Sequence, residues 1–336
     1  MLNNKVENSV RDVSPNDNQD QEGKLSFLLT IALSNTGRDD QDLERVKLLI
    51  RSFMKYFDGS KLSKFFIVTT GRDEAVVKHA IGPLFASQKL EILNENEVCP
   101  EFENDPDTTN TWPKPNKGWY RQQLIKLAIH ERIDTPFYMT LDSDVLFVKP
   151  FSANSLIRGG KAALNVQTEA DFSRLYRKEI VAHEVEVRES RYNRAEYILK
   201  CKRKPAYIKQ WYGETPVLFN CRIVKALTGH IEAAWMKPWR QALLDNLPWT
   251  EYPLYFLFAE EHDLLQAYYV CGTADSVLRL SQSLWQPADR YVVSRDLSNW
   301  KPDLIFDSGD EGVAVVVQSY LGYPIADIAK RINPFL

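Results

Sequence analysis

The sequence has few cysteines and lacks any long apolar run. Its 336 residues include four cysteines, and no two of them are close enough to form a CxxC pair. This spacing excludes a zinc knuckle, a redox dithiol motif and a disulfide scaffold. No apolar run approaches the roughly 18 residues of a membrane-spanning helix, and the first residues lack the basic and then apolar order of a signal peptide. We therefore expect a cytoplasmic protein with reduced thiols.

The sequence also lacks a marked excess of charge of either sign. The 42 Lys and Arg residues nearly balance the 45 Asp and Glu residues, so the net charge is −3 at pH 7. A chain without a basic excess is not expected to bind nucleic acid. Hydrophobic residues make up 44% and charged residues 26% of the chain, which is typical of a globular protein. Collagen-like and fully disordered chains are therefore excluded.

Strand and helix patterns alternate along the first half of the chain. Residues 1–24 are mostly polar and predict a disordered tail. After this tail, short apolar runs predict strands, and apolar residues spaced three or four apart predict helices. The expected strands are Leu25–Leu33, Phe65–Thr70, Leu90–Leu93 and Phe137–Leu141, and the expected helices are Asp40–Phe57, Asp73–Ile81 and Trp119–Glu131. This alternation predicts an α/β fold with a mostly parallel sheet flanked by helices.

Two segments depart from this alternation. Residues 99–118 contain four prolines and show no periodicity, which predicts a long loop. Residues 171–204 carry ten Lys or Arg and six Asp or Glu, a local net charge of +4. Because the pattern there is helical and not strand-like, we expect a helical insert near residues 171–210.

The best candidate for chemistry is Asp142-Ser143-Asp144, which directly follows the apolar strand expected at Phe137–Leu141. In an extended chain, residues i and i+2 face the same side, so the two carboxylates would repel each other. Mg²⁺ or Mn²⁺ would remove that conflict, with phosphate oxygens and water completing the ligand set. In open α/β sheets, ligands bind beyond the carboxyl ends of the strands, which is where this pair is expected. A solvated turn or a helix cap is the alternative interpretation.

The helix expected just before this strand has two different faces. Leu124, Ile125, Ala128 and Ile129 form its apolar face, and Trp119, Gln122, Gln123 and Lys126 lie on the opposite side at helical spacing. The Lys126 ammonium would suit a phosphate group, and a glutamine amide offers a donor and an acceptor to a base or ribose. An ordinary solvated helix face is the alternative.

Four sequence blocks occur in a fixed order and together carry a resemblance. They are GWYRQQLIKLAI (118–129), FYMTLDSDVLFVKPF (137–151), ETPVLFN (214–220) and TEYPLY (250–255). With these blocks the chain resembles bacterial glycosyltransferases of the GT-A type that carry a DxD motif, in particular a group from polysaccharide loci. The resemblance implies a Rossmann-like fold in which residues 25–150 form the half that binds a nucleotide sugar. Residues 151–336, with the helical insert, would form the half that binds the acceptor.

The same resemblance implies roles for individual residues. Asp144 would ligate Mn²⁺ or Mg²⁺, and Asp142 would contact the metal, its bound water or the donor ribose. The donor would also contact Thr30 and the polar helix face, namely Trp119, Gln122, Gln123 and Lys126. Many GT-A enzymes add a C-terminal histidine as a metal ligand, whereas the late segment here reads Gln318-Ser319-Tyr320. The third metal ligand therefore stays open.

The acceptor side requires a base if the reaction inverts the anomeric configuration. Glu251 is the first candidate because it starts an expected helix beside two tyrosines, where partial desolvation would raise its pKa. Its alternative role is to stabilise that helix start within a capping box formed with Thr250. Glu261 and Asp263 belong to a second acidic cluster and are further catalytic candidates. Thr215, Asn220 and Tyr252 are the expected acceptor contacts, although Asn220 could instead cap the next helix.

The expected acceptor is a saccharide or a lipid-linked glycan, with peripheral contact at a membrane surface. We expect the basic insert to gate or bind it through an anionic group, and a solvated helical face is the alternative. Two other functions remain open. The string YMTLDSDVLF also resembles the start of phosphatases of the haloacid dehalogenase type, and Trp112, Trp119, Trp211 and Trp249 could serve a non-catalytic glycan-binding protein.

Overall fold

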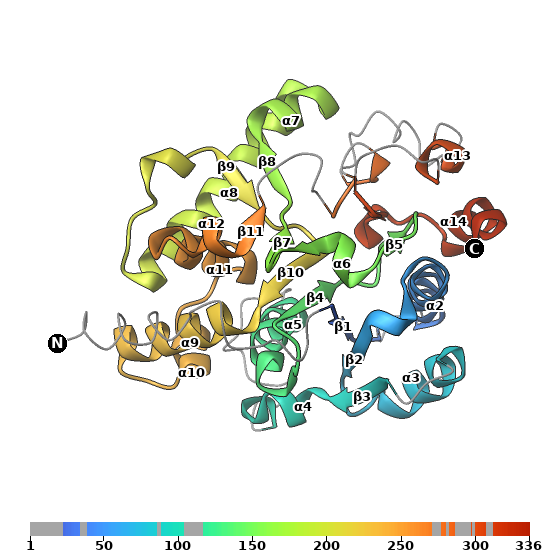
Figure 1. Ribbon diagram of the computed structural model, residues 1–336, viewed down its shortest axis with the longest axis horizontal. Helices are drawn as coiled ribbons and strands as arrows, with labels where there is room; N and C mark the ends of the chain where they lie inside the picture. Colours follow the sequence, from blue (N-terminus) through green and yellow to red (C-terminus); the bar gives the residue numbers. More distant parts are fainter. Residues whose placement is uncertain are drawn as a thin grey trace.

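A central sheet runs through the protein (Figure 1). The computed structural model describes residues 23–33, 39–85, 89–103, 117–270, 277–279, 282–285, 297, 300–306 and 312–336. Five strands form the sheet in the order β10-β4-β1-β2-β3, namely β1 (Leu25–Ile31), β2 (Leu62–Thr69), β3 (Leu90–Asn94), β4 (Phe137–Leu141) and β10 (Val217–Asn220). β1 to β4 are mutually parallel, and β10 runs antiparallel to β4. The predicted α/β class with a mostly parallel sheet is confirmed.

The helix α2 (Asp39–Tyr56) follows β1. It packs on the sheet because its apolar residues recur with helical spacing and form one face. Phe53 is 1% exposed, and its ring centroid lies 4.8 Å from that of Phe27 in β1 and 5.0 Å from that of Phe65 in β2. Met54, in contrast, is 45% exposed. Met54 directly follows Phe53, and one residue turns a helix by about 100°, which carries Met54 beyond the edge of the buried stripe.

Several further helices surround the sheet. α3 (Glu74–Ile81) joins β2 to β3, and α5 (Lys117–Ala128) packs against β1. The later helices include α9 (Cys221–Trp235), α10 (Trp239–Leu244), α11 (Glu251–Glu261), α12 (Leu264–Tyr268) and α14 (Ile325–Ile332). Of the long loop expected at 99–118, residues 104–116 lie outside the described part, as do residues 1–22 of the expected tail. Among the residues that the structure describes, no helix combines the length and apolar character needed to cross a membrane.

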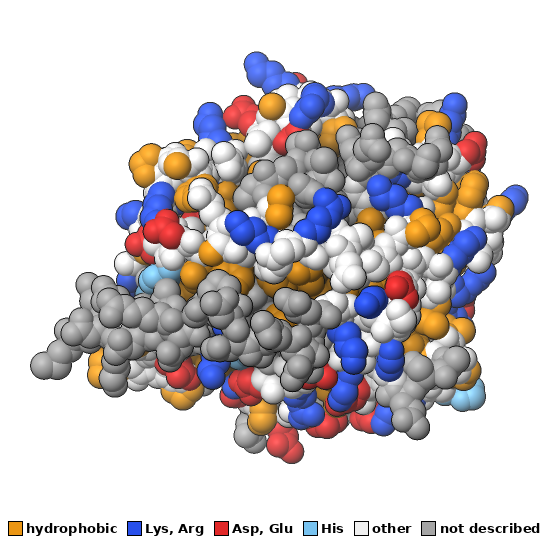
Figure 2. Space-filling view, viewed as in Figure 1, with side chains coloured by type: hydrophobic (Ala, Val, Ile, Leu, Met, Phe, Trp, Pro, Cys, Tyr) orange, Lys and Arg blue, Asp and Glu red, His pale blue; other side chains and the backbone are white. Residues whose placement is uncertain are grey.

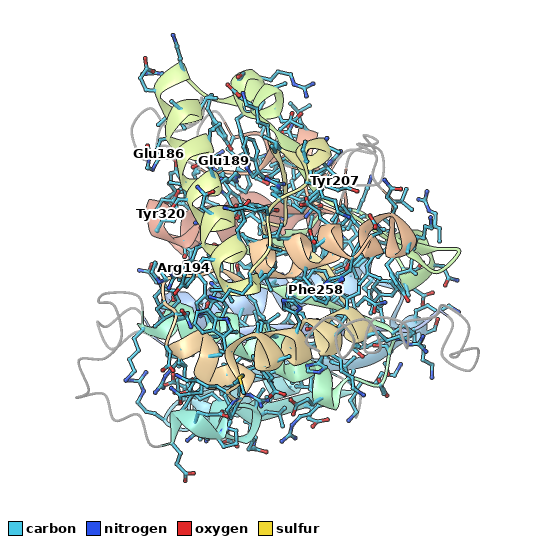
Figure 3. All side chains as sticks on the ribbon, turned by 90° about the vertical axis from the view of Figure 1, so that its left-hand side faces the viewer. Glu186, Glu189, Arg194, Tyr207, Phe258 and Tyr320 are labelled. Atoms are coloured by element: carbon cyan, nitrogen blue, oxygen red, sulfur yellow. The ribbon has the colours of Figure 1, made fainter. Side chains whose placement is uncertain are left out.

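Residues 166–212, which precede β10, include two α-helices and a two-stranded sheet. α7 (Glu169–Leu175) and α8 (Lys178–Leu199) follow β8 (Val166–Thr168), which pairs antiparallel with β9 (Gln210–Tyr212). α8 packs against α11, and Figure 3 shows Glu186, Glu189 and Arg194 along its length. This unit lies beside the sheet in Figure 1 and forms one wall of the site described below.

A short antiparallel pair brings the C-terminal part of the chain to the sheet edge. β5 (Val145–Phe147) follows the DxD residues directly, and it pairs with β12 (Ala314–Val316). The Val317 amide then donates to the Asp144 carbonyl at 3.0 Å. The residues after β12, Gln318 to Tyr320, are thereby placed beside the DxD motif, although they are about 175 residues away in sequence.

Candidate functional site

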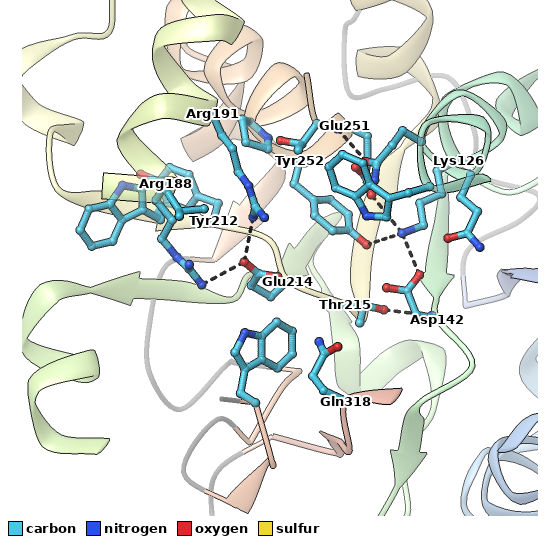
Figure 4. Close-up of a pocket in the computed structure, with 18 of the residues that line it drawn as sticks. Lys126, Asp142, Arg188, Arg191, Tyr212, Glu214, Thr215, Glu251, Tyr252 and Gln318 are labelled. Carbon is cyan, nitrogen blue, oxygen red and sulfur yellow. Dashed lines mark hydrogen bonds and ion pairs between the residues drawn. The ribbon is translucent and has the colours of Figure 1, made fainter. Parts of the chain in front are cut away.

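A cavity of about 640 Å³ opens at the carboxyl ends of β1 and β4. The register of these strands pairs Leu29 with Leu141, so Thr30 and Asp142 follow side by side. The cavity brings together most of the residues expected from the sequence, namely Thr30, Trp119, Gln122, Gln123, Lys126, Asp142, Asp144, Thr215, Glu251 and Tyr252. The parallel strands β1 and β4 bring Thr30 and Asp142 to this edge. Residues of α5, of the turn before β10 and of the start of α11 meet them there (Figure 4).

The two DxD carboxylates differ in their surroundings. Asp144 is 9% exposed, and its Oδ2 accepts a hydrogen bond of 3.2 Å from the Ser319 amide. Its Oδ1 is buried without a partner among the described residues. Burial and the charge of Asp142 raise the pKa of Asp144 to about 7, while Arg45 acts in the opposite direction. A buried carboxylate oxygen without a partner is costly, so this position favours a cation.

The donor set fits a divalent metal in part. Two carboxylates are enough for Mg²⁺ or Mn²⁺ when substrate phosphates and water supply the remaining oxygens. No cluster of three or more His, Cys, Asp or Glu side chains that could hold a metal occurs in the described part of the chain. Gln318 and Ser319 line the same cavity. They belong to the late segment that has no histidine, the residue that many GT-A enzymes add there as a metal ligand. Any ligand from this segment would therefore be an amide or hydroxyl oxygen.

Lys126 is the buried cation of the site. Its side chain is 4% exposed, and its Nζ lies 2.8 Å from Asp142 Oδ1 and 3.0 Å from Glu251 Oε1. The Tyr252 hydroxyl lies 3.3 Å from the same nitrogen. Burial alone would lower the pKa of Lys126, but the two carboxylates outweigh it and raise this pKa well above its usual value. The polar face of α5 lines the cavity, and Gln123 and Lys126 on that face are buried. It is therefore not an ordinary solvated helix face.

Glu251 is the first residue of α11 and is 2% exposed. Burial raises its pKa, whereas the charge and hydrogen bond of Lys126 act against that rise. The capping box expected with Thr250 does not form, because the Thr250 side chain makes no capping hydrogen bond. Instead, Gln123 Oε1 accepts a hydrogen bond of 3.2 Å from the Glu251 amide. A side chain of α5 thus satisfies the start of α11 and fixes Glu251 relative to Lys126.

A sharp turn before β10 forms the floor of the cavity. Gly213 has φ +104°, and a Cβ atom there would lie 2.6 Å from Cβ of Tyr252, so only glycine fits. The Thr215 hydroxyl, two residues later, accepts a hydrogen bond of 3.1 Å from the Asp142 amide. Asn165 Nδ2 donates to the carbonyls of Glu214 and Pro216 at 3.2 and 2.9 Å. The turn is therefore fixed to the DxD loop at one end and to Asn165 at the other.

A second cavity of about 390 Å³ shares Thr30 and Gln122 with the first. It lies beyond the carboxyl ends of β1 and β2 and is also lined by Thr70, Arg72 and Arg121. Arg72 donates to the Leu33 carbonyl at 2.6 Å, and Arg121 pairs with Glu95 at 2.6 Å. The two cavities together form an elongated space along the edge of the parallel strands.

Three of the expected site residues lie outside the main cavity. Asn220 is 2% exposed and caps α9, because its Oδ1 accepts from the Arg222 and Ile223 amides at 3.0 and 3.2 Å. Its alternative role as a helix cap is thus the one that the structure contains. Glu261 is the last residue of α11 and Asp263 follows that helix, and neither lines the cavity. The Asp263 side chain is 84% exposed and pairs with Lys204.

Some lining residues were not found from the sequence. Gln167, Glu184, Arg188, Arg191 and Glu214 line the end of the cavity formed by α8 and β8. Glu184 and Arg188 do have the i, i+4 spacing of a helical ion pair, but that spacing is common on solvated helices. Of the tryptophans considered as sugar platforms, Trp211 and Trp249 are 2% exposed, whereas Trp119 is 37% exposed at the cavity. Trp112 lies outside the described residues.

The chain belongs to the family DUF6492, a family of unknown function, whose model matches residues 22–336. Its structure is similar to that of mouse xyloside xylosyltransferase 1 in the apo form, with a TM-score of 0.50 and 12% identity over 90% of this chain and 100% of that chain. Galactosyltransferase LgtC in complex with donor and acceptor sugar analogues matches with a TM-score of 0.45 and 10% identity, over 87% of this chain and 86% of that chain. No curated protein matches the chain in sequence. The likeness to the xylosyltransferase confirms the predicted GT-A fold.

Replacing Lys126 by methionine tests the buried ion pairs. Methionine keeps much of the side-chain volume but leaves Asp142 and Glu251 facing each other without a cation. Breaking a buried ion pair typically costs about 3–5 kcal/mol. We expect K126M to lower the free energy of unfolding by about that amount, measured by urea denaturation at pH 7.

A second variant and a control make this prediction specific. Adding E251Q to K126M removes one of the two carboxylates and should recover most of the lost stability. The control K225M changes an exposed position of α9. It should have the same free energy of unfolding as the wild type. Equal stability of K126M and the wild type would show that the ammonium does not hold this part of the structure together.

Proposed function

We propose that this member of the family is a metal-dependent glycosyltransferase, which moves a sugar from a nucleotide-sugar donor to a saccharide or glycolipid acceptor in surface glycan synthesis. The observation that carries the proposal is the pair of DxD carboxylates at the end of β4, with the buried Asp144 oxygen left without a partner. The proposal includes a cytoplasmic location and peripheral contact with a membrane that carries a lipid-linked acceptor. The GT-A fold supports it as a fold alone, because the same fold can host different chemistry.

Asp142 and Asp144 would hold the metal, which is Mn²⁺ or Mg²⁺ in this proposal. When bound, such an ion stabilises the negative charge of a leaving diphosphate. The remaining protein contacts near the diphosphate would come from Gln318 and Ser319, which line the cavity next to Asp144. Lys126 is not free to act as a simple phosphate ligand because two carboxylates already hold its ammonium. We assign to Lys126 the positioning of Asp142 relative to Glu251.

The nucleoside of the donor would occupy the second cavity. That cavity begins at Thr30 and Gln122 next to the DxD motif and continues along the ends of β1 and β2. Amide and guanidinium groups there offer donors and acceptors to a base and a ribose. The donor sugar would then point from the diphosphate into the main cavity, toward Tyr252 and Glu251.

Glu251 is the proposed base of an inverting reaction. As the acceptor oxygen forms its bond to the anomeric carbon, the acceptor proton would pass to the Glu251 carboxylate, and the bond to the diphosphate would break. Burial raises the pKa of this carboxyl, which brings a carboxylate closer to the basicity that proton removal near neutral pH requires.

Substituting Glu251 by glutamine tests that role. Glutamine keeps the shape but cannot take a proton, so E251Q should lower kcat by about 10²–10⁴-fold while donor affinity is largely kept. The control E186Q changes an exposed glutamate of α8 outside the cavity and should leave kcat unchanged. NMR of the product should show an inverted anomeric configuration. Retention of configuration, or normal kcat in E251Q, would contradict the assignment of Glu251 as the base.

Binding of nucleoside diphosphates tests the function itself. Wild-type protein should show a higher melting temperature with at least one nucleoside diphosphate in a panel, and only when Mn²⁺ is present. Because the pKa of Asp144 is raised to about 7, protons compete with the metal at acidic pH. The metal-dependent rise should therefore be larger at pH 8 than at pH 6.

The variant D144N should fold but lose the metal-dependent rise, since an amide replaces the carboxylate ligand. The matched control D303N changes an exposed aspartate of α13 (Pro302–Ile305) and should keep the rise. The proposal fails if no nucleoside diphosphate with Mn²⁺ raises the melting temperature of the wild type. It also fails if D144N shows the same metal-dependent rise in melting temperature as the wild type. Phosphate release from a phosphomonoester, without hydrolysis of any nucleotide sugar, would instead favour the phosphatase alternative.

A further inference from the structure

Gln167 lies in the wall of the main cavity with one half of its amide unused. It is the central residue of β8 and is 4% exposed. Its Oε1 accepts a hydrogen bond of 3.2 Å from Arg188, and its Nε2 is buried without a partner among the described residues. Arginine can only donate, so it fixes the amide with the oxygen toward α8. The Nε2–H groups are thus left for another acceptor.

Arg188 fixes a second group of the same wall. Its guanidinium is buried, pairs with Glu184 one helical turn earlier, and lies 4.5 Å from the centroid of the Phe172 ring. Its Nη2 also lies 2.9 Å from Glu214 Oε1. One planar guanidinium therefore orients both the Gln167 amide and the Glu214 carboxylate. Figure 4 shows its ion pair with Glu214.

Glu214 presents a hydrogen-bond acceptor that is held by the same guanidinium. Both of its ion pairs, with Arg188 and with Arg191 at 3.6 Å, use Oε1. Its Oε2 is not engaged by either pair. An amide donor and a carboxylate acceptor held by the same guanidinium suit a hydroxyl group, which both donates and accepts a hydrogen bond.

The charges at this end of the cavity balance. Arg188 and Arg191 are opposed by Glu184 and Glu214, all of which line the cavity. The net positive charge of residues 171–204 is further offset by acids outside that range, because Arg203 pairs with Glu260 and Lys204 with Asp263. Lys and Arg side chains are also scattered over the face shown in Figure 2. Among the described residues that line this end of the cavity, both arginines are paired, so no unpaired cation is left there for the anionic group expected from the sequence.

An aromatic ring also lines the main cavity, on the segment that follows β12. Tyr320 lines the cavity and is 59% exposed, and its hydroxyl donates to the Trp285 carbonyl at 2.6 Å. The exposed face of an aromatic ring, with its hydroxyl already bonded elsewhere, suits the apolar face of a sugar ring.

From this arrangement we propose that the α8 end of the cavity is the subsite for a neutral acceptor sugar, in which Gln167 and Glu214 bind hydroxyl groups and Arg188 positions both. The inference rests on the proposed transfer function, because the second cavity and the DxD motif are assigned to the donor and leave this end for the acceptor. Adjacent residues of one turn join the two ends, since Thr215 contacts the DxD loop and Glu214 contacts Arg188.

Ligand-observed NMR with simple glycosides tests the subsite without requiring catalysis. The probes are the methyl glycosides of glucose and galactose, which are neutral, and methyl glucuronoside and glucose 1-phosphate, which are anionic. We expect saturation transfer to at least one neutral glycoside. Gln167→Leu keeps the side-chain volume and removes both amide groups, so it should weaken that binding about tenfold. The control Gln266→Leu, at an exposed position of α12, should bind as the wild type does.

Each other result would overturn the inference. Equal binding by Gln167→Leu and the wild type, with both folded by circular dichroism, would remove Gln167 from the subsite. A preference for the anionic probes, lost in Arg191→Gln, would restore anion recognition. Binding of none of the probes by the wild type would exclude a neutral sugar subsite. Hydrolysis of nucleotide sugars is measured on the same wild-type sample. Glycoside binding without any hydrolysis would mean that the proposed function fails, whereas hydrolysis without glycoside binding would mean that this inference fails.

Discussion

The Lys126 ammonium group is buried, and it forms ion pairs with carboxylates from two distant parts of the chain. Asp142 and Glu251 lie 2.8 and 3.0 Å from its Nζ. A buried ammonium requires such partners, so α5, the DxD loop and the start of α11 must keep fixed relative positions. Gln123, three residues earlier on α5, adds a hydrogen bond to the Glu251 amide. The geometry of the whole cavity depends on this contact.

The turn before β10 extends this constraint to the other end of the cavity. Gly213 approaches Tyr252 so closely that no side chain fits. The two following residues point to different partners, because Thr215 binds the DxD loop and Glu214 binds Arg188 of α8. A shift of α8 would therefore be transmitted through the single peptide unit between Glu214 and Thr215 to the Asp142 amide. Such a link gives a physical reason for a ligand at the α8 end of the cavity and a ligand beside the DxD motif to influence each other.

Much of the fold, and the part of the cavity around the DxD motif, could be predicted from the sequence. An apolar strand that ends in two aspartates, after several strand and helix units, predicted the position of Asp142 and Asp144 by local periodicity alone. The polar face of α5 was found as well, although its burial was not, because a lysine that meets two distant carboxylates leaves no local signal. Gln167 and Glu214 were missed for the same reason, since tertiary packing alone brings them together on Arg188. Asn220 shows the opposite case, in which a polar residue at a strand end caps the following helix.

A crystal structure of the protein with a nucleoside diphosphate and Mn²⁺ tests the central claim most directly. The account predicts an anomalous manganese signal beside Asp142 and Asp144, the diphosphate between the metal and the segment from Gln318 to Tyr320, and the nucleoside in the cavity lined by Arg72 and Arg121. Lys126 should remain paired with Glu251 in that complex. A nucleotide bound elsewhere, or at this edge with no metal on either aspartate, would contradict the account.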